Sequence, residues 1–182
     1  MEQKLDLMFF IPGELISILT FPGIIVHEFA HMFFCKVRKV VVFDACYFRI
    51  GNPAGYVVHE NTGNFTTTFL VSMGPFIINT LLCLLICLPA YMPVKFFNLN
   101  HPLSYFLIWL GVSIGMHAIP SNQDANIMFQ QARENIKRRN PLAILSFPLT
   151  GLIYIFNFLR FFWADLIYGV AIGIGIPSLI FG

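Results

Sequence analysis

Long apolar stretches separated by short polar segments dominate the sequence. Three of them run at about Leu7–Cys35, Phe65–Ala90 and Leu103–Ile119, and most of the chain after Pro141 is also apolar. An apolar helix of about 20 residues is long enough to cross the hydrocarbon core of a bilayer. The pattern therefore predicts an α-helical polytopic membrane protein with about five transmembrane helices.

Two of these stretches carry signs of interruption. Pro12-Gly13 and Pro22-Gly23 lie within the first stretch and predict a kink or break in it. The apolar sequence after Pro141 fits two helices divided near Arg160. One bent continuous helix is the alternative, because no Gly or Pro marks a turn there.

A short segment after the first apolar stretch has the pattern of strands rather than of a helix. Residues Val40–Ile50 are rich in β-branched and aromatic side chains, Gly51–Gly55 have strong turn chemistry, and Tyr56–Val58 resume the strand pattern. The sequence predicts a small β-hairpin here. Its free edge is a place where an extended peptide can add by main-chain hydrogen bonds.

An amphipathic helix is predicted to follow the third apolar stretch. Its apolar and polar residues fall on opposite faces of the helix. The apolar face consists of Ala125, Met128, Phe129, Ala132 and Ile136, and the polar face consists of Gln130, Gln131, Glu134 and Lys137. Such a helix is typical of a membrane interface. Asn140-Pro141 then resembles an N-cap and first helical position.

Composition supports the membrane assignment. The chain is 57% hydrophobic and only 11% charged, far from the averages of a soluble domain. A length of 182 residues suits a single membrane-embedded domain over residues 1–182. The net charge of +2 is spread over loops and indicates no nucleic-acid partner. We expect the lipid bilayer itself to surround the chain.

The first apolar stretch contains an H-E-x-x-H motif formed by His27, Glu28 and His31. Residues four apart lie on the same face of a helix, so the two histidines can bind one metal ion. Glu28 points about a quarter-turn away and can reach a water without ligating the metal. Two purely structural histidines are the alternative, which the cost of ionisable groups in lipid disfavours.

Three further polar residues lie in apolar context. Asn79 either joins helices or faces a site, because a buried amide in lipid needs partners. His117 and Asp124 lie in a polar cluster around Pro120. Asp124 falls in the first turn of the amphipathic helix, where a carboxylate is favourable for the helix dipole alone.

The distribution of Lys and Arg orients the predicted site. Lys36, Arg38 and Lys39 follow the first apolar stretch and Arg133 and the run 137–139 follow the third, against Lys95 alone after the second. The positive-inside rule places the first two groups in the cytoplasm. We therefore expect an integral protein of the plasma (inner) membrane with its active site toward the cytoplasm.

Four features together resemble the site-2 protease family of intramembrane zinc metalloproteases. They are the HEFAH at His27–His31, the hairpin segment after it, the Gly74-Pro75 helix with Asn79, and the segment Pro120–Asp124. The family commonly has Asn where this chain has His117, and an Asp-Gly pair where it has Asp124-Ala125. Its Asn also follows Gly-Pro one residue earlier, and its Pro-to-Asp spacing is one residue longer. The chain therefore looks like a divergent member.

The resemblance implies a Zn²⁺ ion held by His27, His31 and Asp124, with Glu28 as the general base. His117 or Asn79 would then hold the substrate backbone or the developing oxyanion. The expected activity is hydrolysis of peptide bonds in transmembrane or membrane-associated protein substrates near the cytoplasmic face. The sequence does not indicate an oligomeric state.

Two other readings stay open. A different class of membrane zinc protease uses Glu as third ligand and acts on lipidated or misfolded proteins, which would require Glu60 or Glu134. A non-enzymatic zinc-binding protein, such as a carrier, is the second. A carrier should have polar residues along several spans, whereas this chain concentrates them at one end.

Overall fold

The computed structural model describes residues 13–96, 101–136 and 140–181. It is mostly helical with one two-stranded sheet. The elements in chain order are α1 (Gly13–Leu19), α2 (Phe21–Val37), β1 (Val42–Cys46), β2 (Tyr56–His59), α3 (Phe65–Phe96), α4 (Pro102–Met116), α5 (Asn122–Ile136), α6 (Pro141–Leu159), the 3-10 turn η1 (Arg160–Phe162), α7 (Ala164–Val170), the π-helical turn η2 (Ala171–Gly175) and α8 (Ile176–Phe181).

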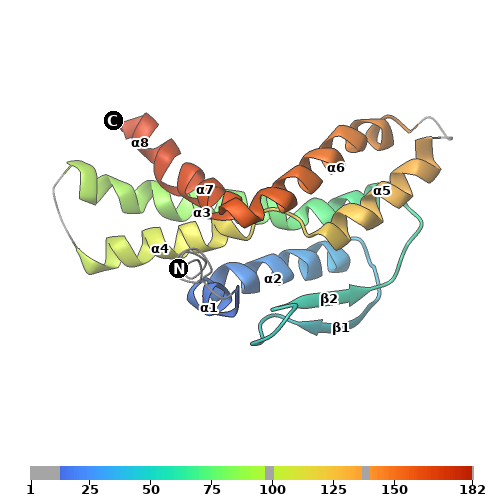
Figure 1. Cartoon of the computed structure of the whole chain (residues 1–182), viewed down its shortest axis with the longest axis horizontal. Helices are drawn as coiled ribbons and strands as arrows, with labels where there is room; N and C mark the ends of the chain where they lie inside the picture. Colours follow the sequence, from blue (N-terminus) through green and yellow to red (C-terminus); the bar gives the residue numbers. More distant parts are fainter. Residues whose placement is uncertain (1–12, 97–100, 137–139, 182) are drawn as a thin grey trace, which may run out of the picture.

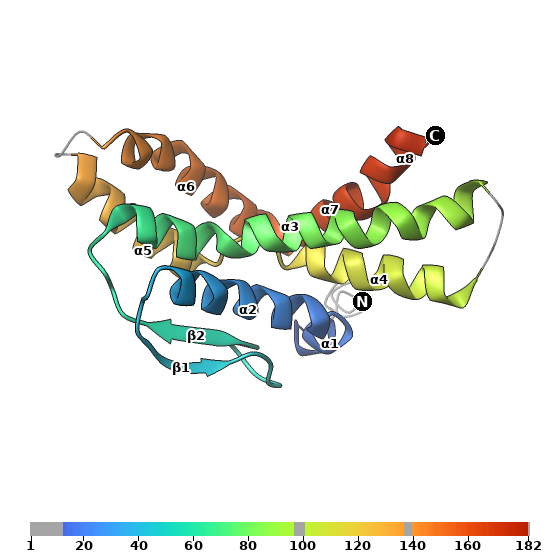
Figure 2. The ribbon, with the colours of Figure 1, turned by 180° about the vertical axis from the view of Figure 1, so that it is seen from behind.

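The long helix α3 is the axis around which the other elements pack. Its 32 residues extend over about 48 Å at 1.5 Å per residue. Figures 1 and 2 show α4 along one half of α3, with α5 and α6 along the other half and α2 beside its middle. The chain after α6 turns away so that α7 and α8 pack against α3 and α4. The helices α2, α4, α5 and α8 therefore all pack directly against α3.

Three breaks between helices lie near the middle of the molecule in Figure 1. The helices α1 and α2 are bent by 82° at Thr20, as Pro22-Gly23 predicted. A short irregular segment after His117 separates α4 from α5. The third break is η1, where Trp163 has a left-handed φ of 62°. Helix ends leave backbone N–H and C=O groups without partners in their own helix. The hydrogen bonds that these groups need are therefore concentrated near the three breaks, in otherwise apolar surroundings.

Fewer helices than the predicted five are long and apolar enough to cross a membrane. Among the described residues, these are α3, α6 with η1, and α7 through α8, and the bent pair α1–α2 makes up to a fourth. The helix α4 has 15 residues. It therefore extends over only about 22 Å, which is shorter than a hydrocarbon core of about 30 Å. The predicted division near Arg160 is confirmed by η1.

Two sequence predictions fall on parts of the chain outside the described residues. The predicted first span begins at Leu7, whereas the description begins at Gly13. The basic run 137–139, which helped to orient the site, also lies outside it. The predicted N-cap Asn140 is described, and its side chain accepts a hydrogen bond from the backbone N–H of Leu142 at 3.1 Å.

The predicted β-hairpin is confirmed. The strands β1 and β2 pair antiparallel, with Cys46 opposite Tyr56 and an irregularity between Val42 and Asp44. Figures 1 and 2 show the hairpin lying along α2, on the side of α2 that faces away from α3. The turn that joins the strands is thus held near the helix that carries the H-E-x-x-H motif.

The amphipathic helix is present as α5, and Ala125, Met128 and Ala132 of its predicted apolar face are buried against protein, whereas Phe129 and Ile136 are exposed. These three buried residues pack in one core cluster with residues of α3 and α6, which consists of Phe65, Met73, Ala125, Met128, Ala132, Ala143 and Ile153. The sequence analysis assigned the whole face to a membrane interface, whereas α3 and α6 cover the part made of small Ala and flexible Met side chains. This packing fixes the position of the first turn of α5, which contains Asp124.

Candidate metal centre

The fold brings together three metal-ligating side chains that the sequence analysis singled out. His27 and His31 lie one turn apart on α2, and Asp124 lies in the first turn of α5. One ligand atom from each lies within 4.8 Å of the other two. No other group of three or more His, Cys, Asp or Glu residues in the described part of the chain meets this spacing. The cluster can hold a metal ion.

Backbone carbonyls orient both imidazoles. The Nδ1 of His27 lies 2.6 Å from the carbonyl oxygen of His117, and the Nδ1 of His31 lies 3.0 Å from that of Val71. A carbonyl oxygen only accepts hydrogen bonds, so each Nδ1 carries the proton and donates it. Each neutral ring then has its lone pair on Nε2, which is the atom that a metal requires.

The two Nε2 atoms face one another 3.2 Å apart. Two ligand nitrogens at about 2.0 to 2.1 Å from a tetrahedral metal are separated by about 3.3 Å. The observed separation therefore fits a shared cation, which would remove the repulsion between two facing lone pairs. The Oδ2 of Asp124 lies 3.7 Å from the Nε2 of His31, a few tenths longer than this geometry needs.

Asp124 also caps its own helix. Its Oδ2 accepts hydrogen bonds from the backbone N–H of Ser121 at 2.9 Å and from the Ser121 hydroxyl at 2.6 Å. The Ser121 hydroxyl in turn accepts the backbone N–H of Asp124 at 3.1 Å. This reciprocal arrangement is a capping box with Asp in place of the usual Glu. It fixes the carboxylate beside His31, and it is also a structural role that Asp124 has without any metal.

Glu28 lies at a pocket beside the cluster. Glu28 is buried, with 8% of the residue exposed. The pocket holds about 290 Å³ of space that water can reach. It is lined by Ser17, Ile24, His27, Glu28, Asn52, Pro53, Ala54, Gly55, His117, Ile119, Ser121 and Arg160. The turn of the hairpin therefore forms one wall, and a carboxylate and a ligand imidazole form part of another.

His117 holds the site mainly through its backbone. Its carbonyl oxygen accepts from His27, while its ring Nε2 lies 2.8 Å from the hydroxyl oxygen of Thr20. The Thr20 hydroxyl uses its hydrogen on the carbonyl of Ile16 at 2.7 Å, so the Nε2 of His117 is the donor. The imidazole lines the pocket, with its Nε2 already paired.

Asn79 is fully buried between α2, α3 and α4. Its amide nitrogen lies within hydrogen-bond distance of the carbonyl oxygens of Gly23 at 3.3 Å, Ile114 at 3.1 Å and His117 at 3.2 Å. Its Oδ1 has no partner among the described residues. Asn79 does not line the pocket. Its contacts are those of a residue that joins helices, one of the two readings its sequence context allowed.

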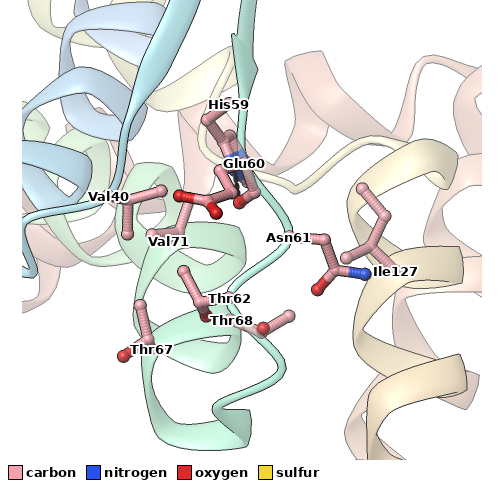
Figure 3. A pocket seen from close by; sticks show the side chains of 9 residues that line it. All are labelled: Val40, His59, Glu60, Asn61, Thr62, Thr67, Thr68, Val71 and Ile127. Atoms are coloured by element: carbon pink, nitrogen blue, oxygen red, sulfur yellow. Dashed lines mark hydrogen bonds between the residues drawn. The ribbon is translucent and has the colours of Figure 1, made fainter.

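The two alternative third ligands lie elsewhere. Glu60 and Glu134 are both exposed, and neither belongs to the cluster of His27, His31 and Asp124. Figure 3 shows Glu60 at a separate pocket between the end of β2, the start of α3 and α5. The geometry therefore favours Asp124 over either glutamate as the third ligand.

Sequence reasoning missed three contributors to the site. Val71 contributes only a backbone carbonyl, for which no sequence signal exists. Ser121 carries a signal, because Ser followed three residues later by Asp is a capping-box pattern. Arg160 also carries one, as a lone cation in apolar sequence, although it was used only to divide two helices.

Comparison with known proteins adds no assignment. No protein-family model, no curated protein and no solved structure matches this chain.

Proposed function

We propose that this protein is a membrane-embedded zinc metallopeptidase of the site-2 protease type, with a Zn²⁺ ion held by His27, His31 and Asp124. The supporting observation is the pair of Nε2 atoms 3.2 Å apart, both oriented by backbone carbonyls, with a carboxylate 3.7 Å from one of them. Two imidazoles and one carboxylate with a position left open are a common ligand set for catalytic zinc.

In this proposal the zinc ion and Glu28 have different roles in peptide-bond hydrolysis. Zinc in such a site acidifies water and polarises a carbonyl group. Glu28 is the general base, because it lies in the same pocket as His27 without belonging to the ligand cluster. It takes a proton from the attacking water and later gives it to the leaving amine. The burial of Glu28 limits bulk water around this transfer.

The hairpin supports a substrate in extended conformation. Its turn, from Asn52 to Gly55, lines the pocket directly. A two-stranded sheet has free edges, and a peptide can pair with such an edge through main-chain hydrogen bonds. A transmembrane substrate first has to unwind, because a helix uses its own peptide groups. We therefore propose transmembrane or membrane-associated protein segments as substrates, cleaved near the cytoplasmic side.

A substitution of Glu28 tests catalysis apart from metal binding. The purified Glu28→Gln protein should retain about one zinc per chain and lose hydrolysis by at least about 100-fold, because general-base catalysis typically contributes 10²–10⁴-fold. The matched control is Glu14→Gln, which alters an exposed glutamate on α1. Elemental analysis measures zinc, and mass spectrometry in H₂¹⁸O detects one ¹⁸O in each new carboxylate.

A panel of tagged single-span membrane proteins with Gly or Pro within the span serves as substrate. Cleavage by the wild type and the Glu14 variant, but not by Glu28→Gln, supports the proposal. Zinc in both proteins without any ¹⁸O incorporation would instead favour a non-enzymatic zinc-binding protein. Absence of zinc from protein never exposed to chelator would contradict the proposal outright.

A further inference from the structure

Arg160 is a cation at the break between two apolar helices. It begins η1, with the candidate spans 141–162 and 164–181 meeting there. Figure 1 places this break near the middle of the molecule, beside the segment that joins α4 to α5. A charge in such surroundings is costly and is usually retained for function.

Two groups hold the guanidinium in place. Its Nε lies 2.7 Å from the Oδ2 of Asp165, and its Nη2 donates to the carbonyl oxygen of Ile119 at 3.2 Å. Its Nη1 has no hydrogen-bond partner among the residues that the structure describes. The Arg160 side chain is 40% exposed. A fixed guanidinium with an unused donor therefore remains accessible.

Arg160 is one of the residues that line the pocket of the metal centre. His27, Glu28 and His117 line the same pocket, so the guanidinium lies in the same cavity as a proposed zinc ligand and the proposed general base. The two residues first expected to bind an oxyanion have other partners here. The His117 Nε2 is paired with Thr20, and Asn79 lies outside the pocket.

We propose that Arg160 stabilises the negative charge that develops on the oxygen of the scissile carbonyl, an inference that rests on the proposed peptidase function. When water adds to the carbonyl carbon, its proton passes to Glu28 and the carbonyl oxygen gains the electron pair. A preoriented guanidinium forms a stronger hydrogen bond to this negatively charged oxygen than to the oxygen of the neutral carbonyl group. The charge disappears again when the C–N bond breaks and the amine takes the proton from Glu28.

A purely structural role for Arg160 has to be separated from this one. By binding the Ile119 carbonyl, Arg160 also restrains the segment between His117 and Ser121. Loss of that restraint would displace Asp124 and weaken zinc and every ligand alike. A role in charge stabilisation instead affects only ligands that carry the developing charge. Binding of two matched peptides to the zinc-loaded protein distinguishes the roles without measuring catalysis.

The experiment uses an apolar peptide with a phosphinate in place of one peptide bond, and the same peptide with a neutral ketomethylene group there. Calorimetry measures both dissociation constants. Arg160→Ala should weaken phosphinate binding about 100-fold, in line with the loss of one oxyanion donor, and leave the ketomethylene peptide within about threefold. Arg160→Lys keeps the charge and should recover part of the loss. Arg133→Ala, which removes an exposed cation of α5, is the matched control.

The outcomes separate this inference from the proposed function. Equal weakening of both peptides, or of neither, in zinc-loaded Arg160→Ala overturns the assignment while the wild type still binds zinc and hydrolyses substrate. A wild type that takes up no zinc overturns both. Where Arg160→Ala does not fold, the phosphinate-to-ketomethylene ratio in zinc-loaded Arg160→Lys decides, and a ratio equal to that of the wild type overturns the assignment.

Discussion

The carbonyl oxygen of His117 accepts hydrogen bonds from the side chains of both His27 and Asn79. The distances are 2.6 Å from the His27 Nδ1 and 3.2 Å from the Asn79 amide nitrogen. One backbone atom at the end of α4 thus joins the imidazole of a proposed ligand on α2 to a buried amide on α3. Groups that orient a ligand in this way tune metal affinity almost as strongly as the ligand itself.

Asn79→Leu should therefore impair both stability and metal binding. The substitution leaves the carbonyl groups of Gly23 and Ile114 without their amide donor, at a cost of about 1–3 kcal/mol in the free energy of unfolding. Loss of support for His117 should weaken zinc binding about 10- to 100-fold. Competition with a fluorescent zinc chelator measures the affinity.

Thr150→Val provides the control for that experiment. Thr150 is buried in α6, and its hydroxyl donates to the Ser146 carbonyl within the same helix. This variant should lose stability without a change in zinc affinity. If the two variants have the same zinc affinity, Asn79 only joins helices.

Removal of metal should lower thermal stability through the same cluster. A ligand that binds only the folded state, at a free concentration about 100 times its dissociation constant, contributes about 2.7 kcal/mol to stability. Treatment with a chelator should therefore lower the Tm of the wild type, and added zinc should restore it. His31→Ala should show no zinc-dependent shift, whereas His59→Ala, which alters a hairpin histidine outside the cluster, should behave as the wild type does.

The parts of this molecule that the sequence predicted depend on local spacing. The pairing of His27 with His31, the turn of the hairpin and the cap at Asn140 each follow from residues within a few positions of one another. The distribution of Lys and Arg placed Asp124 only on the same membrane side as these histidines, and the family resemblance alone predicted their contact, because nearly a hundred residues separate Asp124 from His31. Its proximity now rests on the packing of α5 against α3 and α6.

The features that the sequence did not predict are the positions of helix ends and the contacts between distant helices. The number of spans was overestimated because hydropathy does not reveal that α4 ends at Met116. The helix is therefore too short to count as a span, and an irregular segment separates it from α5. The contact of Arg160 with the Ile119 carbonyl joins two helix breaks about forty residues apart. A periodic pattern within one segment carries no information about such a contact.

Gly55 should be required because there is no room for a side chain between it and Glu28. A Cβ added to Gly55 would lie 2.7 Å from the Cγ of Glu28 and 3.1 Å from its Oε1, so the carboxylate has to shift. We expect Gly55→Ala to lower hydrolysis about 100-fold, the typical effect of misplacing a reacting group by about 1 Å, with zinc content unchanged. Gly151→Ala is the control, because nothing lies within 4 Å of a Cβ there. Full activity of Gly55→Ala would mean that the hairpin turn moves freely from Glu28.

Asp124 offers the sharpest test of the metal centre, because its carboxylate has a structural use that needs no metal. Its Oδ2 closes the capping box with Ser121, and the same atom lies 3.7 Å from the Nε2 of His31. Asp124→Ala removes both contributions. The two roles therefore have to be separated by variants that each affect one of them.

Asp124→Asn keeps an oxygen that can accept the Ser121 N–H but removes the negative charge. If Asp124 is a ligand, this variant should remain as stable without metal as the wild type and lose zinc affinity at least about 10-fold, since a neutral amide compensates less of the cation's charge. Ser121→Ala removes the hydroxyl of the cap and should lower stability by about 1 kcal/mol, with a smaller effect on zinc. Metal-free Tm values and chelator competition measure the two quantities separately. If Asp124→Asn binds zinc as tightly as the wild type, the carboxylate only caps α5, and the centre lacks its third ligand.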